Sequence, residues 1–306
     1  MKKEIEEGMS KLNRISKTTN IVFNIIFIIL SLVCILPVVF VFMISISSES
    51  SLARYGYQFI PREFSAASYL FLWGEIETIV KALGVSVFVT IVGTILGVIL
   101  TTLLGYVLSR SNYKLNGFLT YMVFIPMIFN GGMLSSYVIN TNLLGFKDSI
   151  WALILPLLVS SFNVVICKTF FKSTIPDSII ESAKIDGATQ LNIFARIVVP
   201  ISKPVFATIG LFLCFGYWND WFQSSLYIND ANLISLQAML NNIQRNVQYL
   251  ANNPSAGLSL QQYKNLMPQE GARMAIAIVI IAPIACAYPF FQKYFISGLT
   301  IGAVKG

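Results

Sequence analysis

The sequence offers few side chains that could carry out catalysis. It contains no histidine, which excludes histidine-based triads and histidine metal sites. Its four cysteines lie in separate apolar blocks, a pattern typical of packing rather than of a disulfide or a metal site: Cys34, Cys167, Cys214 and Cys286. No G-x-x-x-x-G-K-[ST] stretch is present, so the chain has no Walker-type ATP site of its own. We therefore expect no enzymatic activity, no metal and no cofactor in this chain.

The most informative polar segment lies just before Pro200. Ser178 and Glu181 have the S-x-x-E spacing of a capping box, which predicts a helix that begins at Ser178. Gly187 falls where a left-handed residue would end that helix, Thr189 can cap a second short helix, and Pro200 would end it. Two short helices around a glycine turn would form a rigid knob. This knob would either lie on the membrane surface or dock with a cytoplasmic protein.

Within the second predicted helix, Leu191, Phe194 and either Ile197 or Val198 share one face.

The elements that must position this segment are membrane spans. Hydrophobic residues make up 56% of the chain and charged residues 11%, and the mean hydropathy is +0.72. A soluble domain needs more charge than this to cover its surface, and a bilayer-spanning helix needs about 20 mostly apolar residues. The pattern predicts an all-α membrane protein with six transmembrane helices, over residues 21–46, 82–108, 117–139, 150–171, 204–228 and 272–292.

We expect a single transmembrane domain over residues 1–306. The first apolar block is too long for a signal peptide and therefore predicts an uncleaved span. The polar segments outside the spans are a cytoplasmic N-terminal tail at 1–20, an insert at 172–203, an extracytoplasmic loop at 229–271 and a cytoplasmic tail at 293–306.

The distribution of basic residues orients the chain. With a cytoplasmic N-terminus, inside segments hold five Lys or Arg in the tail, two at 109–116, five between 168 and 203 and two at the C-terminus, which is 14 of the 21. The other seven lie outside, so both termini are predicted to be cytoplasmic. The net charge of +7 is explained by these loops, and because no basic and aromatic cluster accompanies it we expect no nucleic-acid partner.

Polar side chains inside the predicted spans are candidates for a functional site, because they are costly in hydrocarbon. Asp220 in the fifth span is flanked by Trp218, Asn219 and Trp221. These residues either contact a sugar or lie at the outer interface as aromatic anchors, and we favour the second interpretation. Asn163 in the fourth span either lines a pore or bonds a neighbouring helix.

The insert resembles the EAA loop of ABC importer permeases, which reads E-A-A, three residues, Gly, nine residues and I-x-L-P. The corresponding residues here are Glu181-Ser182-Ala183, Gly187 and Ile197-Val198-Val199-Pro200, so the spacing matches and two residue types differ. Asp186-Gly187-Ala188 is similar to the D-G-A of the carbohydrate branch.

Other stretches also resemble the maltose-permease-like branch, and especially importers of complex oligosaccharides in Gram-positive bacteria. They are Ile125–Gly132, Tyr217–Trp221 and the terminal Gly-Ala-Val-Lys-Gly306. Ser135 departs from the pattern, because the branch often has a proline there.

The resemblance implies a type I ABC importer permease fold in a multi-pass protein of the bacterial cell membrane. In that family two permease subunits form the pore, two cytoplasmic ATPase subunits bind ATP and Mg²⁺, and an extracytoplasmic sugar-binding protein delivers the oligosaccharide. The loop at 229–271 would face that binding protein. The residues implied to contact the ATPase are Glu181, Ala183, Asp186, Gly187, Ala188 and Pro200, together with Val304, Lys305 and Gly306 of the tail.

Two other classes of protein are alternatives. An ion-coupled secondary transporter would need ionisable residues near the middle of several spans, and here Asp220 stands alone. A non-transporting membrane scaffold would have no need for the spacing of residues 181–200.

Overall fold

The computed structural model describes residues 16–110, 112–252 and 269–303. In these ranges the chain forms helices and no extended strand, with one isolated bridge between Ser47 and Phe64. The contacts divide the chain into two compact units. The first holds the residues up to Trp73 together with a short stretch that ends at Ile278, and the second holds the remainder. The single domain over 1–306 stays a prediction.

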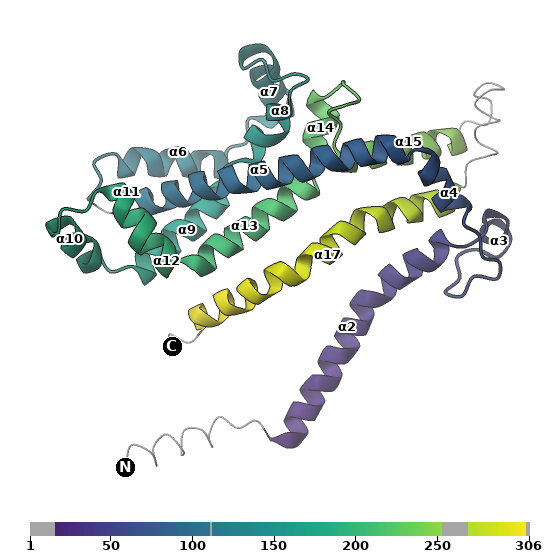
Figure 1. The fold of residues 1–306 in the computed structure, drawn as a ribbon, viewed down its shortest axis with the longest axis horizontal. Helices are drawn as coiled ribbons and strands as arrows, with labels where there is room; N and C mark the ends of the chain where they lie inside the picture. Colours follow the sequence, from purple (N-terminus) through teal and green to yellow (C-terminus); the bar gives the residue numbers. More distant parts are fainter. Residues whose placement is uncertain (1–15, 111, 253–268, 304–306) are drawn as a thin grey trace. The chain divides into compact units, whose positions relative to one another are not determined.

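The first unit contains α2 (Lys17–Ser45), α3 (Glu49–Tyr55), most of α4 (Ala67–Gly74) and the start of α17 (Gln269–Ala303) (Figure 1). The helix α2 is apolar on all sides, and its most apolar stretch has no buried residue within the chain. A helix that is apolar all round is typical of a membrane span.

A hydrogen-bonded latch fixes the start of α17 within the first unit. The Glu49 carboxylate accepts the backbone N–H groups of Glu270 at 3.1 Å and Gly271 at 3.4 Å. The Tyr57 hydroxyl donates to the Glu270 carboxylate at 2.8 Å, and this hydrogen bond raises the pKa of Tyr57. Glu49 thus satisfies N–H groups that the first turn of a helix leaves without an intrahelical acceptor.

The second unit is built on α5 (Ile76–Ser109), which packs against α9 (Ser161–Thr174) and α13 (Lys203–Trp218) (Figure 1). Glycines of α5 allow the close approach. A Cβ at Gly93 would lie 2.4 Å from the Tyr217 ring, and a Cβ at Gly105 would lie 2.4 Å from the Cys167 Cβ. Small residues at helix contacts are typical of packing in membranes.

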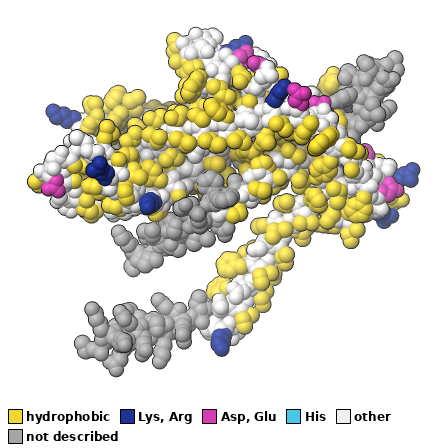
Figure 2. Space-filling view, in the orientation of Figure 1, with side chains coloured by type: hydrophobic (Ala, Val, Ile, Leu, Met, Phe, Trp, Pro, Cys, Tyr) yellow, Lys and Arg dark blue, Asp and Glu magenta, His cyan; other side chains and the backbone are white. Residues whose placement is uncertain are grey.

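The second unit also holds the part of α17 that follows Ile278, and the helices of the insert described below. Its further elements are α6 (Asn116–Ile128), α7 (Gly132–Val138), a π-helical turn η1 (Ile139–Leu143), α8 (Ile150–Ile154), a 3₁₀ turn η2 (Leu155–Leu157), α14 (Phe222–Tyr227) and α15 (Leu236–Asn252). Figure 2 shows hydrophobic side chains over much of the visible face of this unit. Such a surface suits lipid rather than water.

Asp148 joins two loops of the second unit. Its carboxylate accepts the backbone N–H groups of Asn229 and Asp230, and its own N–H donates to the Tyr227 carbonyl at 3.0 Å. The two hydrogen bonds from the backbone N–H groups lower the pKa of Asp148. The loop before α8 is therefore tied to the chain that follows α14.

The expected spans are only partly continuous. In the described part of the chain, α2 and α5 are each long and apolar enough to cross a membrane. Two bent pairs, Ile150–Leu157 with Ser161–Thr174 and Gln190–Ile201 with Lys203–Trp218, raise the number to four if each pair is one span. Six spans and cytoplasmic termini thus stay predictions.

Three of the predicted spans are interrupted. The expected helix at 150–171 breaks between Leu157 and Ser161, with a bend of 46°. The expected helix at 117–139 ends at Ile128 and resumes at Gly132, where φ is +83°, a value that glycine adopts readily. The expected helix at 204–228 stops at Trp218, and α14 follows a break that contains Asp220. The polar segment at 229–271, predicted to be a loop, contains α15, whose residues Leu236 and Ala238 are buried.

Candidate coupling surface and polar sites of the spans

The glycine turn of the insert has the geometry that its sequence predicts. The helix α10 (Asp177–Ile185) ends before Gly187, which has φ +80°. The Ala188 N–H donates to the Ala183 carbonyl and the Gly187 N–H to the Lys184 carbonyl, both at 3.0 Å. These two bonds form a Schellman motif, in which a left-handed glycine satisfies the last carbonyls of a helix. A Cβ at Gly187 would meet no atom within 4 Å, so the need for glycine lies in the backbone conformation.

The predicted capping box is wrong. The helix α10 begins at Asp177, one residue earlier than expected, and its N-cap is Pro176, which makes no side-chain capping bond. Ser178 is therefore already inside the helix, where its hydroxyl cannot take the N-cap role. Pro176 gives the first-turn N–H groups of α10 no side-chain acceptor, and its fixed φ only restricts the backbone where the helix begins.

The second helix of the insert begins as expected at Thr189, whose hydroxyl accepts the Asn192 N–H at 3.4 Å. It ends later than expected. It runs as α11 (Gln190–Ile193), a π-helical turn η3 (Phe194–Val198) and α12 (Val199–Ile201), so Pro200 lies inside it. A proline removes one backbone N–H and its ring crowds the preceding turn, and the wider π-turn relieves both. An 86° bend then leads into α13.

The base of the insert is buried. Ile180 of α10 is 3% exposed, and Ile193 and Val198 are fully buried. All three belong to the main hydrophobic core of the second unit, and Ala183 and Ala188 pack against it. Burial of these side chains fixes the turn against the spans.

The tip of the insert is exposed and apolar. Ile185 is 86% exposed and Leu191 is 73% exposed, on either side of the Gly187 turn. Glu181 and Asp186 are also exposed. The expected face of Leu191, Phe194 and Val198 is therefore split, with Leu191 outside and Val198 in the core. A rigid turn that presents apolar side chains is suited to contact with another surface.

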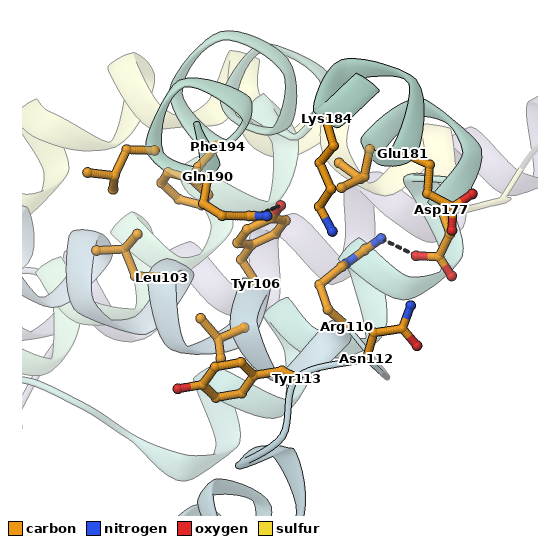
Figure 3. Close-up of a pocket in the computed structure, with 13 residues that line it drawn as sticks. Leu103, Tyr106, Arg110, Asn112, Tyr113, Asp177, Glu181, Lys184, Gln190 and Phe194 are labelled. Atoms are coloured by element: carbon orange, nitrogen blue, oxygen red, sulfur yellow. Dashed lines mark hydrogen bonds and ion pairs between the residues drawn. The ribbon is translucent and has the colours of Figure 1, made fainter. Parts of the chain in front are cut away.

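Arg110, at the end of α5, anchors the insert (Figure 3). Its guanidinium donates to the Asp177 carboxylate at 2.7 Å and to the Phe171 carbonyl at 3.1 Å. The side chain of Arg110 is 14% exposed, so its bond to the Phe171 carbonyl is largely shielded from water, whereas the Asp177 side chain is 69% exposed. One turn earlier on α5, the Tyr106 hydroxyl donates to the Gln190 side-chain oxygen at 3.4 Å. Through these residues α5 holds both helices of the insert.

This anchor was not predicted from the sequence. Arg110 is one of the two basic residues of the expected loop at 109–116, and its partner Asp177 lies 67 positions away along the chain. A single arginine that directly follows an apolar block is the only local signal for it.

A cavity of about 380 Å³ lies between α5 and the insert, as Figure 3 shows. Tyr106 and Phe194 form part of its apolar wall, and Glu181 and Lys184 of α10 line it from the other side. Among the predicted coupling residues, Glu181 is thus the one whose side chain borders this cavity.

The structure gives Asp220 a local partner. Its carboxylate accepts the Gln223 N–H at 3.2 Å, within the first turn of α14. The Asn219 side chain donates back to the Phe215 carbonyl at 3.0 Å. Trp218 is 7% exposed and lines a cavity of about 230 Å³ between α5, α13 and α17. The three neighbouring side chains therefore have different contacts: Trp218 lines the cavity, Asn219 bonds α13 and Asp220 bonds α14. Their assignment to a sugar path or to the interface stays a prediction.

Asn163 lies in another cavity of about 350 Å³, which α9 and α13 line with Phe212, Gly216 and Tyr217. The residue is 6% exposed. The structure thus separates Asn163 from the Trp218 cavity, although Tyr217 lines one cavity and Trp218 the other. The predicted tail contacts at Val304, Lys305 and Gly306 lie outside the described residues.

The fold is that of a solved ABC transporter subunit. The chain matches the crystal structure of a bacterial ABC transporter involved in the import of the acidic polysaccharide alginate, with a TM-score of 0.76 and 24% identity. The match covers 92% of this chain and 99% of that one.

Sequence relatives decide the family. The chain is 36% identical over 274 residues to Protein LplC of Bacillus subtilis, covering 90% of each. It is 36% identical over 276 residues to the polygalacturonan/rhamnogalacturonan transport system permease protein YtcP of the same organism, covering 90% of this chain and 94% of that one. The chain belongs to the permease family of ABC sugar transporters. No family model matches it.

This permease is an integral membrane protein, and its relatives are transport proteins rather than enzymes. A further relative is the arabinooligosaccharides transport system permease protein AraQ of Bacillus subtilis, which is 26% identical over 94% of this chain and 96% of that one. The family assignment favours the ABC permease over a secondary transporter or a scaffold.

Proposed function

We propose that this permease forms half of the pore of an ATP-driven oligosaccharide importer and that residues 177–201 dock with a cytoplasmic ATPase. The sugar classes in the names of the relatives, polygalacturonan or rhamnogalacturonan for YtcP and arabinooligosaccharides for AraQ, support an oligosaccharide as the substrate. A second permease subunit would complete the pore, and an extracytoplasmic binding protein would deliver the sugar to the side that carries α15.

The observation that carries the docking proposal is the exposed pair Ile185 and Leu191 on a turn whose base is buried. Large apolar side chains at the tip of a charged segment have no partner in the described part of the chain. A partner protein that covers them would gain free energy from burial, about 25 cal/mol for each Å².

The predicted coupling residues divide into two groups in this proposal. Glu181 and Asp186 would make polar contacts with the ATPase, because both are exposed next to Ile185. Gly187, Ala183 and Ala188 would hold the turn in shape through the two backbone bonds that end α10. Pro200 would hold the 86° bend that leads into α13.

Motion of the docked turn would reach the pore through Arg110. Because this side chain binds Asp177 and the end of α9 at once, a displacement of α10 would move α5 and α9 together. Asn163 lies on α9 and borders a cavity, so it is the pore candidate nearest to this path.

The proposed topology has six spans with both termini in the cytoplasm. The charge bias of 14 to 7 supports it, as does the position of the insert at the same end of α5 as Arg110. ATP and Mg²⁺ would bind only to the ATPase subunits, and residues 304–306 would reach toward them.

The test is co-purification of the transporter in detergent, with retained ATPase as the readout. A variant with Glu181→Lys and Gly187→Val should lose the ATPase while the two permease subunits stay together. Gly187→Asn is the matched control, because asparagine tolerates the left-handed conformation, and it should retain the ATPase. Full retention by the double variant would show that the insert is not the docking element.

A further inference from the structure

A second cavity at the same end of α5 has the composition of an anion site. It has a volume of about 500 Å³ and lies between the end of α5, the start of α6 and the end of α9. Three basic residues line it, Arg110, Lys168 and Lys172, together with the single acid Asp177. The lining therefore carries a surplus of two positive charges.

That surplus comes from the two lysines. Arg110 is neutralised by Asp177, and its remaining N–H groups bind Ser109 and backbone carbonyls of α9. Lys168 and Lys172 are one helical turn apart on α9 and so share a face. No acid among the described residues lies within ion-pair distance of either ammonium group. Lys168 instead lies over the Phe124 ring of α6, 5.7 Å from its centroid.

The start of α6 adds to the attraction for an anion. Asn116, its first residue, lines the cavity. The helix has no side-chain cap and no acid in its first turn, so the N–H groups there keep their partial positive charge. The start of α10 does not add to this, because Asp177 lies in its first turn.

The surroundings favour a lipid over a soluble anion. The helix α6 rises from the cavity with exposed apolar side chains: Leu115 just before it, then Phe118, Met122 and Ile125, which are between 53% and 63% exposed. Figure 2 shows this helix as a hydrophobic surface. A phospholipid whose headgroup binds in the cavity could place its acyl chains along that surface. A free phosphate could bind the lysines but would not cover the apolar face of α6.

We infer that this cavity binds the phosphate headgroup of an anionic phospholipid, with Lys168 and Lys172 as the cationic ligands. Basic pockets between helices at the cytoplasmic side of a membrane are suited to such headgroups. The assignment to the cytoplasmic leaflet rests on the proposed orientation, whereas the site itself does not. Because Arg110 and Asp177 line the same cavity, the bound lipid would lie directly beside the anchor of the insert.

The test measures lipid binding to the full-length protein, which is purified from membranes together with any subunits that remain bound to it. Delipidated protein in neutral detergent is titrated with phosphatidylglycerol or phosphatidylcholine, and bound lipid is counted by native mass spectrometry. Lys168→Gln with Lys172→Gln should weaken phosphatidylglycerol binding about 30-fold, from the typical contribution of one cation near a membrane surface, taken twice. Lys168→Arg with Lys172→Arg should keep the binding.

The control is Lys114→Gln with Lys203→Gln, which removes two charges near the same end of the spans without touching the cavity lining. It should bind phosphatidylglycerol as the wild type does. Equal loss in this control would overturn the site in favour of general surface attraction. Competition by inorganic phosphate as strong as by the lipid would overturn the lipid assignment. Lipid retention does not require ATPase docking. A negative lipid result would therefore not contradict the docking proposal, and a negative co-purification result would not contradict the lipid site.

Discussion

The Arg110 guanidinium donates a 2.7 Å hydrogen bond to the Asp177 carboxylate, and this bond joins the residue that caps the end of α5 to the first residue of α10. The two groups differ in exposure, at 14% for the Arg110 side chain and 69% for that of Asp177. Most of the anchoring therefore comes from the buried contacts of Arg110 with the carbonyls of α9, and the exposed carboxylate adds less.

Replacing Arg110 should weaken the insert more than replacing its partner. Arg110→Ala leaves the Phe171 carbonyl without its donor and should cost about 2 kcal/mol, whereas Asp177→Asn should cost about 0.5 kcal/mol. Thermal unfolding in detergent, followed by intrinsic fluorescence, measures both. A larger effect from Asp177→Asn would contradict the division of roles.

Replacing Gly187 should separate transport from membrane assembly. Gly187→Val forces a β-branched residue into a φ of +80°, at a cost of about 1–2 kcal/mol or more, and should abolish uptake of oligosaccharide. The subunit should stay in the membrane, because the glycine has no packing contact. Uptake by cells and immunoblots of their membranes are the two measurements. Normal uptake by this variant would remove the basis for the coupling turn.

Replacing Gly93 should disturb the contact between α5 and α13. In Gly93→Ala the new Cβ would overlap the Tyr217 ring, whose hydroxyl is held by the Ile154 carbonyl at 2.7 Å, so the expected loss is about 1–3 kcal/mol. Gly84→Ala on the same helix is the control, because a Cβ there meets nothing within 4 Å. It should be neutral or slightly stabilising. Similar melting temperatures for the two variants would argue against the close contact.

The loop tie at Asp148 should depend on pH. Its pKa is lower in the folded protein than the ordinary value of 3.8, so its stabilisation is fully present above about pH 4 and is lost as the pH falls through the folded pKa. Hydrogen exchange at Asn229 and Asp230 should therefore accelerate at acid pH in the wild type, after correction for intrinsic rates. In Asp148→Ala the exchange should already be fast at neutral pH. Unchanged protection in that variant would mean that other bonds hold the loop.

Replacing Asp220 should distinguish capping from sugar contact. An asparagine can still accept the Gln223 N–H, so Asp220→Asn should leave the apparent affinity for several oligosaccharides unchanged if the carboxylate serves mainly α14. Asp220→Ala should lower thermal stability by about 1 kcal/mol. A selective loss of affinity in Asp220→Asn would instead place the carboxylate on the sugar path.

The local features of the insert were predictable where the chain needs a special backbone conformation. Gly187 and Thr189 could be assigned because a left-handed stop and a helix cap each depend on one residue type. The prediction at Ser178 was wrong because the S-x-x-E spacing does not fix where a helix begins: α10 begins at Asp177, so Ser178 is already inside it. The π-turn before Pro200 was not predicted, because its extra residue has no local sequence signature. A π-turn has more residues per turn than an α-helix, so Ile193 and Val198, five positions apart, can both face the core.

The membrane spans were predictable as apolar blocks and not as continuous helices. Hydropathy does not distinguish a straight helix from one broken at Gly132 or Asn219, because the break leaves the composition unchanged. The Arg110 anchor and the cavity lined by Lys168 and Lys172 depend on residues brought together from distant parts of the chain. No local pattern could have shown them.

The latch at Glu49 bears on how the protein is made. Its acceptor carboxylate and the N–H of Glu270 are 221 positions apart, so at typical synthesis rates the ribosome needs roughly 10 to 45 seconds to supply the second half of the contact. Until then the Glu49 carboxylate at the start of α3 lacks these two N–H donors. A helix made early is thus joined to α17 only late in synthesis, and a chain that stops before α17 can never close this contact.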